Sequence, residues 1–130
     1  MVNAVSNNPA TVSDRGLAIR RKDMAMKYLL LIRGDESAAE HADDGCGGWD
    51  TEMAARGVLV QAGGLRPPAE GKAVRVRRRK LLLSDGPFAE TKEQVGGYCV
   101  ISCASMAEAV DIAAAHPAAA YATIEIRQML

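Results

Sequence analysis

The chain contains few aromatic residues, few cysteines and no excess of charge of either sign. Of its 130 residues, 4% are aromatic and three are cysteines, and 16 basic residues balance 16 acidic ones. A small, odd number of cysteines argues against a disulfide framework and for a reducing compartment. A net charge of 0 argues against a strongly basic surface that would bind nucleic acid.

Long hydrophobic segments are also missing. The apolar run Tyr28–Ile32 is far shorter than the roughly 20 residues of a membrane-spanning helix. The first 25 residues contain no apolar core of a secretory signal. With 48% hydrophobic and 25% charged residues, the composition is that of one globular domain. We therefore expect a cytoplasmic protein with no membrane or nucleic-acid partner.

The chain divides into two parts. Residues 1–25 are rich in Asn, Ser, Ala and Thr and show no sustained period, which predicts a disordered extension. Residues 26–130 contain every periodic segment and are expected to form the domain. A short helix is also expected over 36–42.

Periodicity, caps and glycine stops predict the main elements of the domain. Strands are expected at 26–33, 58–62, 73–77, 81–83, 95–103 and 121–129, and helices at 49–56 and 105–115. The continuous apolar run of the first strand predicts burial on both faces. The paired glycines Gly96 and Gly97 predict a bulge or a close approach. The second helix is expected to bury the stripe Met106, Ala109, Val110 and Ala113.

A basic cluster marks the third and fourth strands. Alternation over 73–77 predicts a half-buried strand with Arg75 and Arg77 outward, and residues 78–80 its turn. The cluster is then the solvated face and tip of a hairpin. The alternative is an anchor for a phosphate or carboxylate.

The order of these elements predicts an α+β, ferredoxin-like fold with an inserted β-hairpin. Two strand–helix–strand halves place both helices on one face of an antiparallel sheet. The other face is then bare, and a large bare apolar face is an interface or a ligand site. A second copy packed sheet to sheet, in a C2 homodimer, would cover it.

One motif stands out in the run Asp85–Glu93, with the sequence DGPFAETKE. Its first three residues, Asp85, Gly86 and Pro87, predict a tight turn. Phe88 is the single phenylalanine of the chain, and we expect it to fill the core beneath this loop.

This motif resembles the signature of the DGPF branch of the YCII-related family. Further similarities are MKYLLLI at 26–32, GVL at 57–59, GGY at 96–98 and IEIR at 124–127. The resemblance covers residues 26–130. It implies a dimeric α+β barrel with a small pocket, and distant relatives with this barrel are lyases and isomerases of small ring compounds. Genes of this branch often lie beside alternative sigma factors, although no residue here indicates DNA contact.

The motif also suggests a site. Asp85 or Glu93 would act as a general base, and Lys92 would attract an anionic substrate. Glu90 and Gly86 would contribute to substrate binding beside them. The alternative is a self-satisfied turn with surface ion pairs, each worth about 0–1 kcal/mol.

Another branch of the family is associated with a His–Asp pair, which this chain does not reproduce. The corresponding positions hold Cys46, eleven residues before Gly57, and His116, before Pro117. A thiol activated by the imidazole is one interpretation of this pair. The other makes Cys46 a small buried residue and His116 a cation at a helix C-terminus, stabilised by the helix dipole.

The remaining reactive or aromatic side chains each have a structural interpretation as well as a functional one. Trp49 is a core anchor or a stacking platform for a substrate. Cys99 and Cys103 share one strand face and are expected to be buried thiols. His41 lies in an acidic stretch whose spacing matches no metal site.

The expected function is the binding of an unidentified small molecule, with lyase or isomerase activity that needs no cofactor or metal. The alternative is a non-catalytic binding module or a regulatory accessory protein.

Overall fold

The computed structural model describes residues 25–35, 47–86 and 94–130. The elements in chain order are β2 (Met26–Gly34), α3 (Trp49–Ala55), β3 (Leu59–Gly64), the 3-10 helix η2 (Pro68–Glu70), β4 (Lys72–Arg77), β5 (Lys80–Asp85), β6 (Gln94–Cys103), α4 (Met106–Ala114), the 3-10 helix η3 (Pro117–Ala120) and β7 (Thr123–Gln128). The expected extension at 1–24, the short helix at 36–42 and the position of Phe88 lie outside the described residues.

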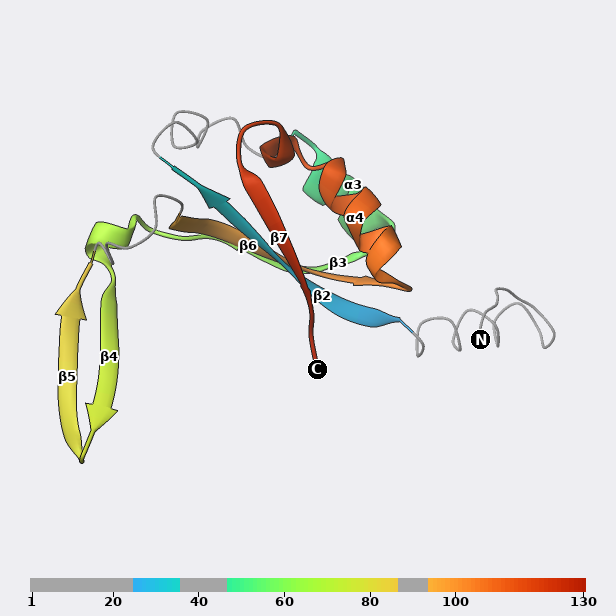
Figure 1. The fold of residues 1–130 in the computed structure, drawn as a ribbon. Coiled ribbons are helices and arrows are strands. Elements are labelled where there is room, and N and C mark those ends of the chain that lie inside the picture. The colour runs from blue at the N-terminus through green and yellow to red at the C-terminus, as the bar shows by residue number, and fades with distance from the viewer. Residues whose placement is uncertain (1–24, 36–46, 87–93) are drawn as a thin grey trace.

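The fold is an antiparallel four-stranded sheet with two helices on one face. The strand order is β3-β6-β2-β7, and Figure 1 shows α3 and α4 side by side on the same side of this sheet. This arrangement confirms the α+β prediction and is compatible with a ferredoxin-like fold. The barrel and the dimer remain predictions.

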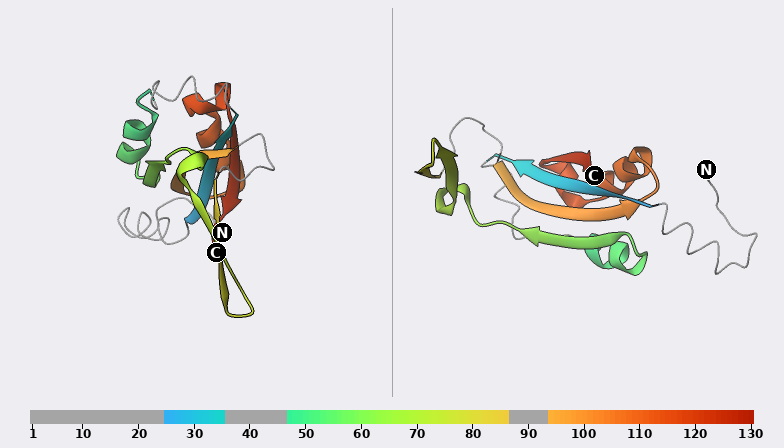
Figure 2. Two further views of the ribbon diagram at one scale, coloured as in Figure 1. Left: turned by 90° about the vertical axis from the view of Figure 1, so that its left-hand side faces the viewer. Right: turned by 90° about the horizontal axis from the view of Figure 1, so that it is seen from below.

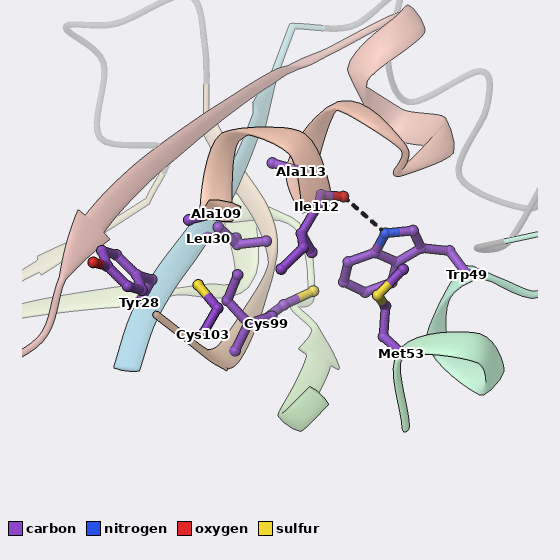
Figure 3. Packing of buried hydrophobic residues seen from close by; sticks show 10 residues of the cluster. Tyr28, Leu30, Trp49, Met53, Cys99, Cys103, Ala109, Ile112 and Ala113 are labelled. Carbon is purple, nitrogen blue, oxygen red and sulfur yellow. Dashed lines mark hydrogen bonds between the residues drawn. The ribbon is translucent and has the colours of Figure 1, made fainter. Parts of the chain in front are cut away.

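The core lies between the sheet and the two helices. Tyr28 and Leu30 of β2 point to the helices, and so do Cys99, Ile101 and Cys103 of β6. Figure 3 shows these side chains packed against those of α3 and α4, namely Trp49, Met53, Ala109, Ile112 and Ala113. The sheet therefore buries one face thoroughly within a single chain.

The prediction that β2 is buried on both faces is wrong for the single chain. Leu29 and Leu31 alternate with the buried residues and are only half-buried, because both helices lie on the other face (Figure 2). An apolar run predicts burial but does not say what covers each face.

The glycines of β6 behave as predicted. Opposite β2, Ile32 pairs with Gly97 and Arg33 pairs with Val95, so Gly96 is the extra residue of a bulge. A Cβ on Gly97 would lie 3.2 Å from the carbonyl oxygen of Gly63 on β3. The pair therefore supplies both a bulge and a close approach of two backbones.

Helix α4 begins where its cap predicts. The Ser105 hydroxyl accepts a hydrogen bond from the Glu108 N–H at 3.1 Å, and the Glu108 carboxylate accepts one from the Ala104 N–H at 2.7 Å. The prediction of the apolar stripe on this helix is partly wrong. Ala109 and Ala113 are buried together with Ile112, whereas Met106 and Val110 are exposed. The helix is rotated so that Ile112 meets the sheet and Trp49.

Strands β4 and β5 form a hairpin outside the main sheet. They make a separate two-stranded sheet, joined by a turn at Arg78 and Arg79. Figures 1 and 2 show this hairpin projecting beyond one end of the molecule, away from both helices. The hairpin itself was predicted correctly. The prediction that its first strand is half-buried is wrong, because Val74 and Val76 are exposed along with the arginines.

Candidate functional site

His116 is the one buried polar side chain in the described ranges 25–35, 47–86 and 94–130. It follows α4 directly and is 5% exposed. Its Nδ1 accepts a hydrogen bond from the Ala118 N–H at 3.0 Å and so caps η3. Its Nε2 is buried with no hydrogen-bond partner among the described residues. A buried polar atom left without a partner is destabilising, and such atoms frequently mark functional sites.

The cap determines the chemical state of this imidazole. Because Nδ1 accepts a hydrogen bond, the proton of the neutral ring is on Nε2. Burial lowers the pKa of His116 below its usual value, and the nearby Asp50 carboxylate opposes this change less strongly. The reading of His116 as a helix C-terminal cation is therefore wrong, since burial and the accepted hydrogen bond both favour the neutral ring.

Trp49 is the first residue of α3 and holds the two helices together. Its Nε1–H donates to the Ile112 carbonyl of α4 at 3.0 Å, as Figure 3 shows. Its ring meets the His116 ring edge-on, with 4.7 Å between ring centroids. Trp49 is therefore a core anchor, as one of its two interpretations from the sequence predicted. Its ring also packs against the imidazole of His116.

The turn before α3 lies beside the residue after His116. Gly47 and Gly48 have φ values of +57° and +89°, which glycine adopts without strain. The position of a Cβ on Gly47 lies 3.4 Å from Cγ of Pro117. The chain that leads into α3 thus passes along the His116–Pro117 segment.

A groove of about 250 Å³ runs between α3 and α4. Met53 and Ile112 contribute to its lining, and so do the charged residues Glu52, Arg56, Glu108 and Asp111. Ala115, which also lines it, directly precedes His116. Glu52 and Arg56 pair at 3.7 Å. The groove therefore ends next to the chain segment that contains His116, and the His116 side chain itself is not part of its lining.

Asp85 and Gly86 lie in a different part of the molecule. Asp85 ends β5 and is exposed, with its carboxylate 2.5 Å from the Lys72 ammonium. The Gly86 N–H donates to the Gly71 carbonyl at 3.0 Å. These contacts tie the base of the hairpin together. In the described part of the chain, neither contact places Asp85 near His116 or Trp49.

Four predicted site residues lie outside the described residues: Cys46, Glu90, Lys92 and Glu93. Their roles stay predictions. Gly47, the first described residue after this gap, lies against Pro117.

The two cysteines of β6 are buried thiols, as predicted. Burial raises the pKa of Cys103 to about 11, and its Sγ lies 3.5 Å from the Ser105 carbonyl oxygen. No group of His, Cys, Asp and Glu within the ranges that the structure describes could hold a metal ion.

Sequence reasoning missed the groove and Asp50. Both depend on α3 and α4 lying side by side, and periodicity within each helix carries no information about the neighbour of that helix. The Trp49–Ile112 hydrogen bond joins residues 63 positions apart, so no local pattern signals it.

The fold and this site define a small α+β domain with a buried histidine at the end of its second helix. A comparison with known families matches the YCII-related domain over residues 26–130. The chain therefore belongs to the YCII-related family. It is also similar to an uncharacterised protein of Rhizobium meliloti (strain 1021), with 34% identity over 103 residues, 68% of this chain and 77% of that protein.

No helix in the described part of the chain is long and apolar enough to cross a membrane.

Proposed function

We propose that this YCII-related domain binds a small oxygen-bearing molecule beside His116 and stabilises the oxygen of that molecule with a hydrogen bond from the Nε2–H of the imidazole. The reaction class that fits is a lyase or isomerase reaction without a cofactor. The observation that carries the proposal is the buried Nε2 of His116, which has no hydrogen-bond partner among the described residues. A ligand oxygen would satisfy it.

The protonation state of His116 suits this role. A neutral imidazole with its proton on Nε2 donates a hydrogen bond to a carbonyl or enolate oxygen. The Ala118 N–H holds the ring in one tautomer and one orientation, and the Trp49 ring packs against it. A lowered pKa keeps the ring neutral at neutral pH, so its Nε2–H is available as a hydrogen-bond donor to negative charge that develops on the ligand oxygen.

The molecule would act as a homodimer, in keeping with the half-buried leucines on the face of the sheet opposite the helices. Asp85, Glu93 and Lys92 form the second proposed site, with Glu90 and Gly86, and Cys46 is the proposed partner of His116. Substitution of Asp85 or of His116 distinguishes this second site from the His116 site.

The test is thermal unfolding of the full chain against a panel of small carboxylates, phenols and lactones. A ligand at 100 times its dissociation constant stabilises the native state by about 2.7 kcal/mol. The key variant is His116→Asn. Asparagine offers an amide oxygen to cap the Ala118 N–H and removes the Nε2 donor.

We expect at least one compound to raise the unfolding midpoint of the native chain and not that of the His116→Asn variant. Asp85→Asn is the matched control and should respond like the native chain. A shift abolished only by Asp85→Asn would move the site to the DGPF motif. A ligand that binds through His116 but is not converted by the protein would favour the alternative, a non-catalytic binding module.

A further inference from the structure

The β4–β5 hairpin has an open backbone edge along β4. Among the described strands, β4 and β5 pair only with each other. The Gly86 N–H donates to the Gly71 carbonyl at 3.0 Å, which makes these two residues a hydrogen-bonded pair. Such pairs alternate with non-hydrogen-bonded pairs along an antiparallel ladder. The backbone N–H and C=O groups of Val74 and Val76 therefore face away from β5.

This edge is accessible to a further strand. Figures 1 and 2 show the hairpin standing clear of the main sheet and of both helices. The Val76 carbonyl accepts a hydrogen bond from the exposed Arg77 side chain at 3.0 Å, which agrees with its outward direction. A hairpin of two strands is marginally stable in water, and a third strand stabilises it. An exposed edge is also a template for pairing with another chain.

One face of the hairpin presents aliphatic side chains beside the open edge. Val74 pairs with Leu83 and Val76 with Leu81 across the two strands, and each is between 57% and 62% exposed. The base of this face carries the Lys72–Asp85 ion pair, so its aliphatic part is limited to these four residues. Aliphatic neighbours on adjacent strands stabilise a sheet. An added strand would therefore gain stability from aliphatic side chains on this face.

The other face presents guanidinium groups along the same edge. Arg75 and Arg77 alternate with the two valines, and neither has an ion-pair partner among the described residues. Residues 72–85 contain six basic residues and one acidic residue, a net charge of +5 in a chain of net charge 0. Opposite charges at neighbouring positions of two strands stabilise the pairing, and like charges oppose it. An added strand is therefore expected to place carboxylates on this face.

The charge of the edge argues against pairing with the same strand of a second copy. Two β4 strands paired antiparallel would place Arg75 and Arg77 of one copy beside those of the other, which is unfavourable. A nucleic acid would match the charge but has no backbone that completes a sheet. A peptide strand with alternating acidic and aliphatic residues matches both faces and the backbone edge.

We propose that the open edge of β4 binds an extended segment of a partner protein in which acidic and aliphatic residues alternate. The segment adds to the hairpin as a third, antiparallel strand. Its carboxylates lie beside Arg75 and Arg77, and its aliphatic side chains extend the row formed by Val74 and Val76. In this mode of recognition, backbone hydrogen bonds give affinity and alternate side chains give specificity. The inference is independent of the ligand at His116 and of the homodimer.

The experiment measures binding of a fluorescent peptide to the full chain by fluorescence anisotropy. The peptide alternates glutamate and valine, has blocked ends, and has six residues, the length of β4. One control peptide has lysine in place of glutamate. Another has the same composition, with the glutamates in one block and the valines in another. We expect saturable binding of the alternating peptide and dissociation constants about tenfold larger or more for both controls.

Two methylated peptides test the backbone pairing. Residues directly opposite each other in a sheet share a face, so a valine of the peptide lies opposite Val74 and exchanges both backbone hydrogen bonds with it. Methyl groups on the valine nitrogens should therefore abolish binding. Methyl groups on the glutamate nitrogens, which face solvent in the added strand, should leave most of it. Equal binding of these two peptides would contradict strand addition.

Variants of the chain test the two arginines. Arg75→Thr, Arg77→Thr keeps strand propensity and removes both charges from the edge. Its matched control, Arg66→Thr, Arg127→Thr, removes two exposed arginines outside the hairpin. We expect the dissociation constant of the alternating peptide to rise about tenfold in the first variant and less than about threefold in the control. Added salt should weaken binding to the native chain more than to the first variant.

The remaining outcomes overturn the proposal. If no peptide binds, the arginines only protect the edge from self-association. If the block peptide binds as tightly as the alternating one, the hairpin attracts acidic peptides by charge and does not add a strand. Binding of duplex DNA that Arg75→Thr, Arg77→Thr abolishes, with no binding of the alternating peptide, would assign the hairpin to nucleic acid instead.

Discussion

At the scale of single residues, His116 is a buried imidazole that folding keeps neutral. Its ring is held by the Ala118 N–H on one side and by the Trp49 ring on another. The remaining nitrogen has no hydrogen-bond partner in the described ranges. The same burial that destabilises this nitrogen also lowers the pKa of the ring, which makes the residue measurable by titration.

Acid should weaken the native state through His116. The pKa of this group lies below 6.5 in the folded chain and near 6.5 in the unfolded chain, so the unfolded state binds the proton more readily. The free energy of unfolding should therefore fall as the pH drops below about 6.5 towards the folded-state pKa. Urea unfolding at a series of pH values measures it.

The His116→Asn variant should lose this component of the pH dependence. The control is His41→Asn, which changes the other histidine of the chain and should leave the component in place. The same slope in the native chain and in His116→Asn, between pH values on either side of about 6.5, would contradict a buried neutral His116.

The thiols of β6 should resist modification. Burial raises the pKa of Cys103 to about 11, so little of its thiolate forms at neutral pH. Cys99 is also buried, which shields it from reagents in solution. In a Cys46→Ser variant, which leaves only these two thiols, a disulfide reagent should label the native chain slowly and the urea-unfolded chain at once. Fast labelling before unfolding would show that this face of β6 opens to solvent.

At the scale of elements, strand β6 depends on two adjacent glycines that have different surroundings. A Cβ on Gly97 would press on the Gly63 carbonyl oxygen at 3.2 Å, while a Cβ on Gly96 would meet nothing within 4 Å. The contact across β3 and β6 is between backbones, so neither strand can relieve it by rotating a side chain.

Gly97→Ala should therefore destabilise the domain by about 1–3 kcal/mol, the usual effect of overpacking. Gly96→Ala is its matched control and should change the free energy of unfolding by less than about 0.5 kcal/mol. Urea unfolding of both variants measures the difference. Equal effects would mean that the bulge, rather than the close approach, selects glycine at these positions.

At the scale of the whole molecule, the projecting β4–β5 hairpin exposes four aliphatic side chains within the described part of the chain, Val74, Val76, Leu81 and Leu83. The core between sheet and helices is complete without them. The stability of the hairpin should therefore depend on whether another surface covers these side chains, whereas that of the main sheet should not.

Amide hydrogen exchange checks this dependence. In the monomer, the amides of β4 and β5 should exchange almost as fast as in an unfolded chain, because a lone hairpin opens readily. At concentrations that favour the proposed homodimer, they should become protected, while the amides of β2 and β6 should change little. Hairpin protection that is independent of concentration would show that the hairpin is stable without a partner.

Much of the fold was predictable because its signals are local. The periodicity over 121–129 predicted strand β7, and caps and glycine stops predicted where the helices begin and end. The hairpin strands were also predictable. Their exposure was not, because alternation cannot show whether a strand joins the main sheet or leaves it.

The sequence by itself determined the order of the elements, the family and the bulge in β6, since each is written in neighbouring residues. Only the tertiary structure decided what lies next to His116 and which faces stay bare. It placed Asp85 at the exposed base of the hairpin and His116 in the interior, because burial and hydrogen-bond partners depend on residues that are distant in the chain. It also set the hairpin apart from the core, because the bare apolar faces follow from packing that no local pattern encodes.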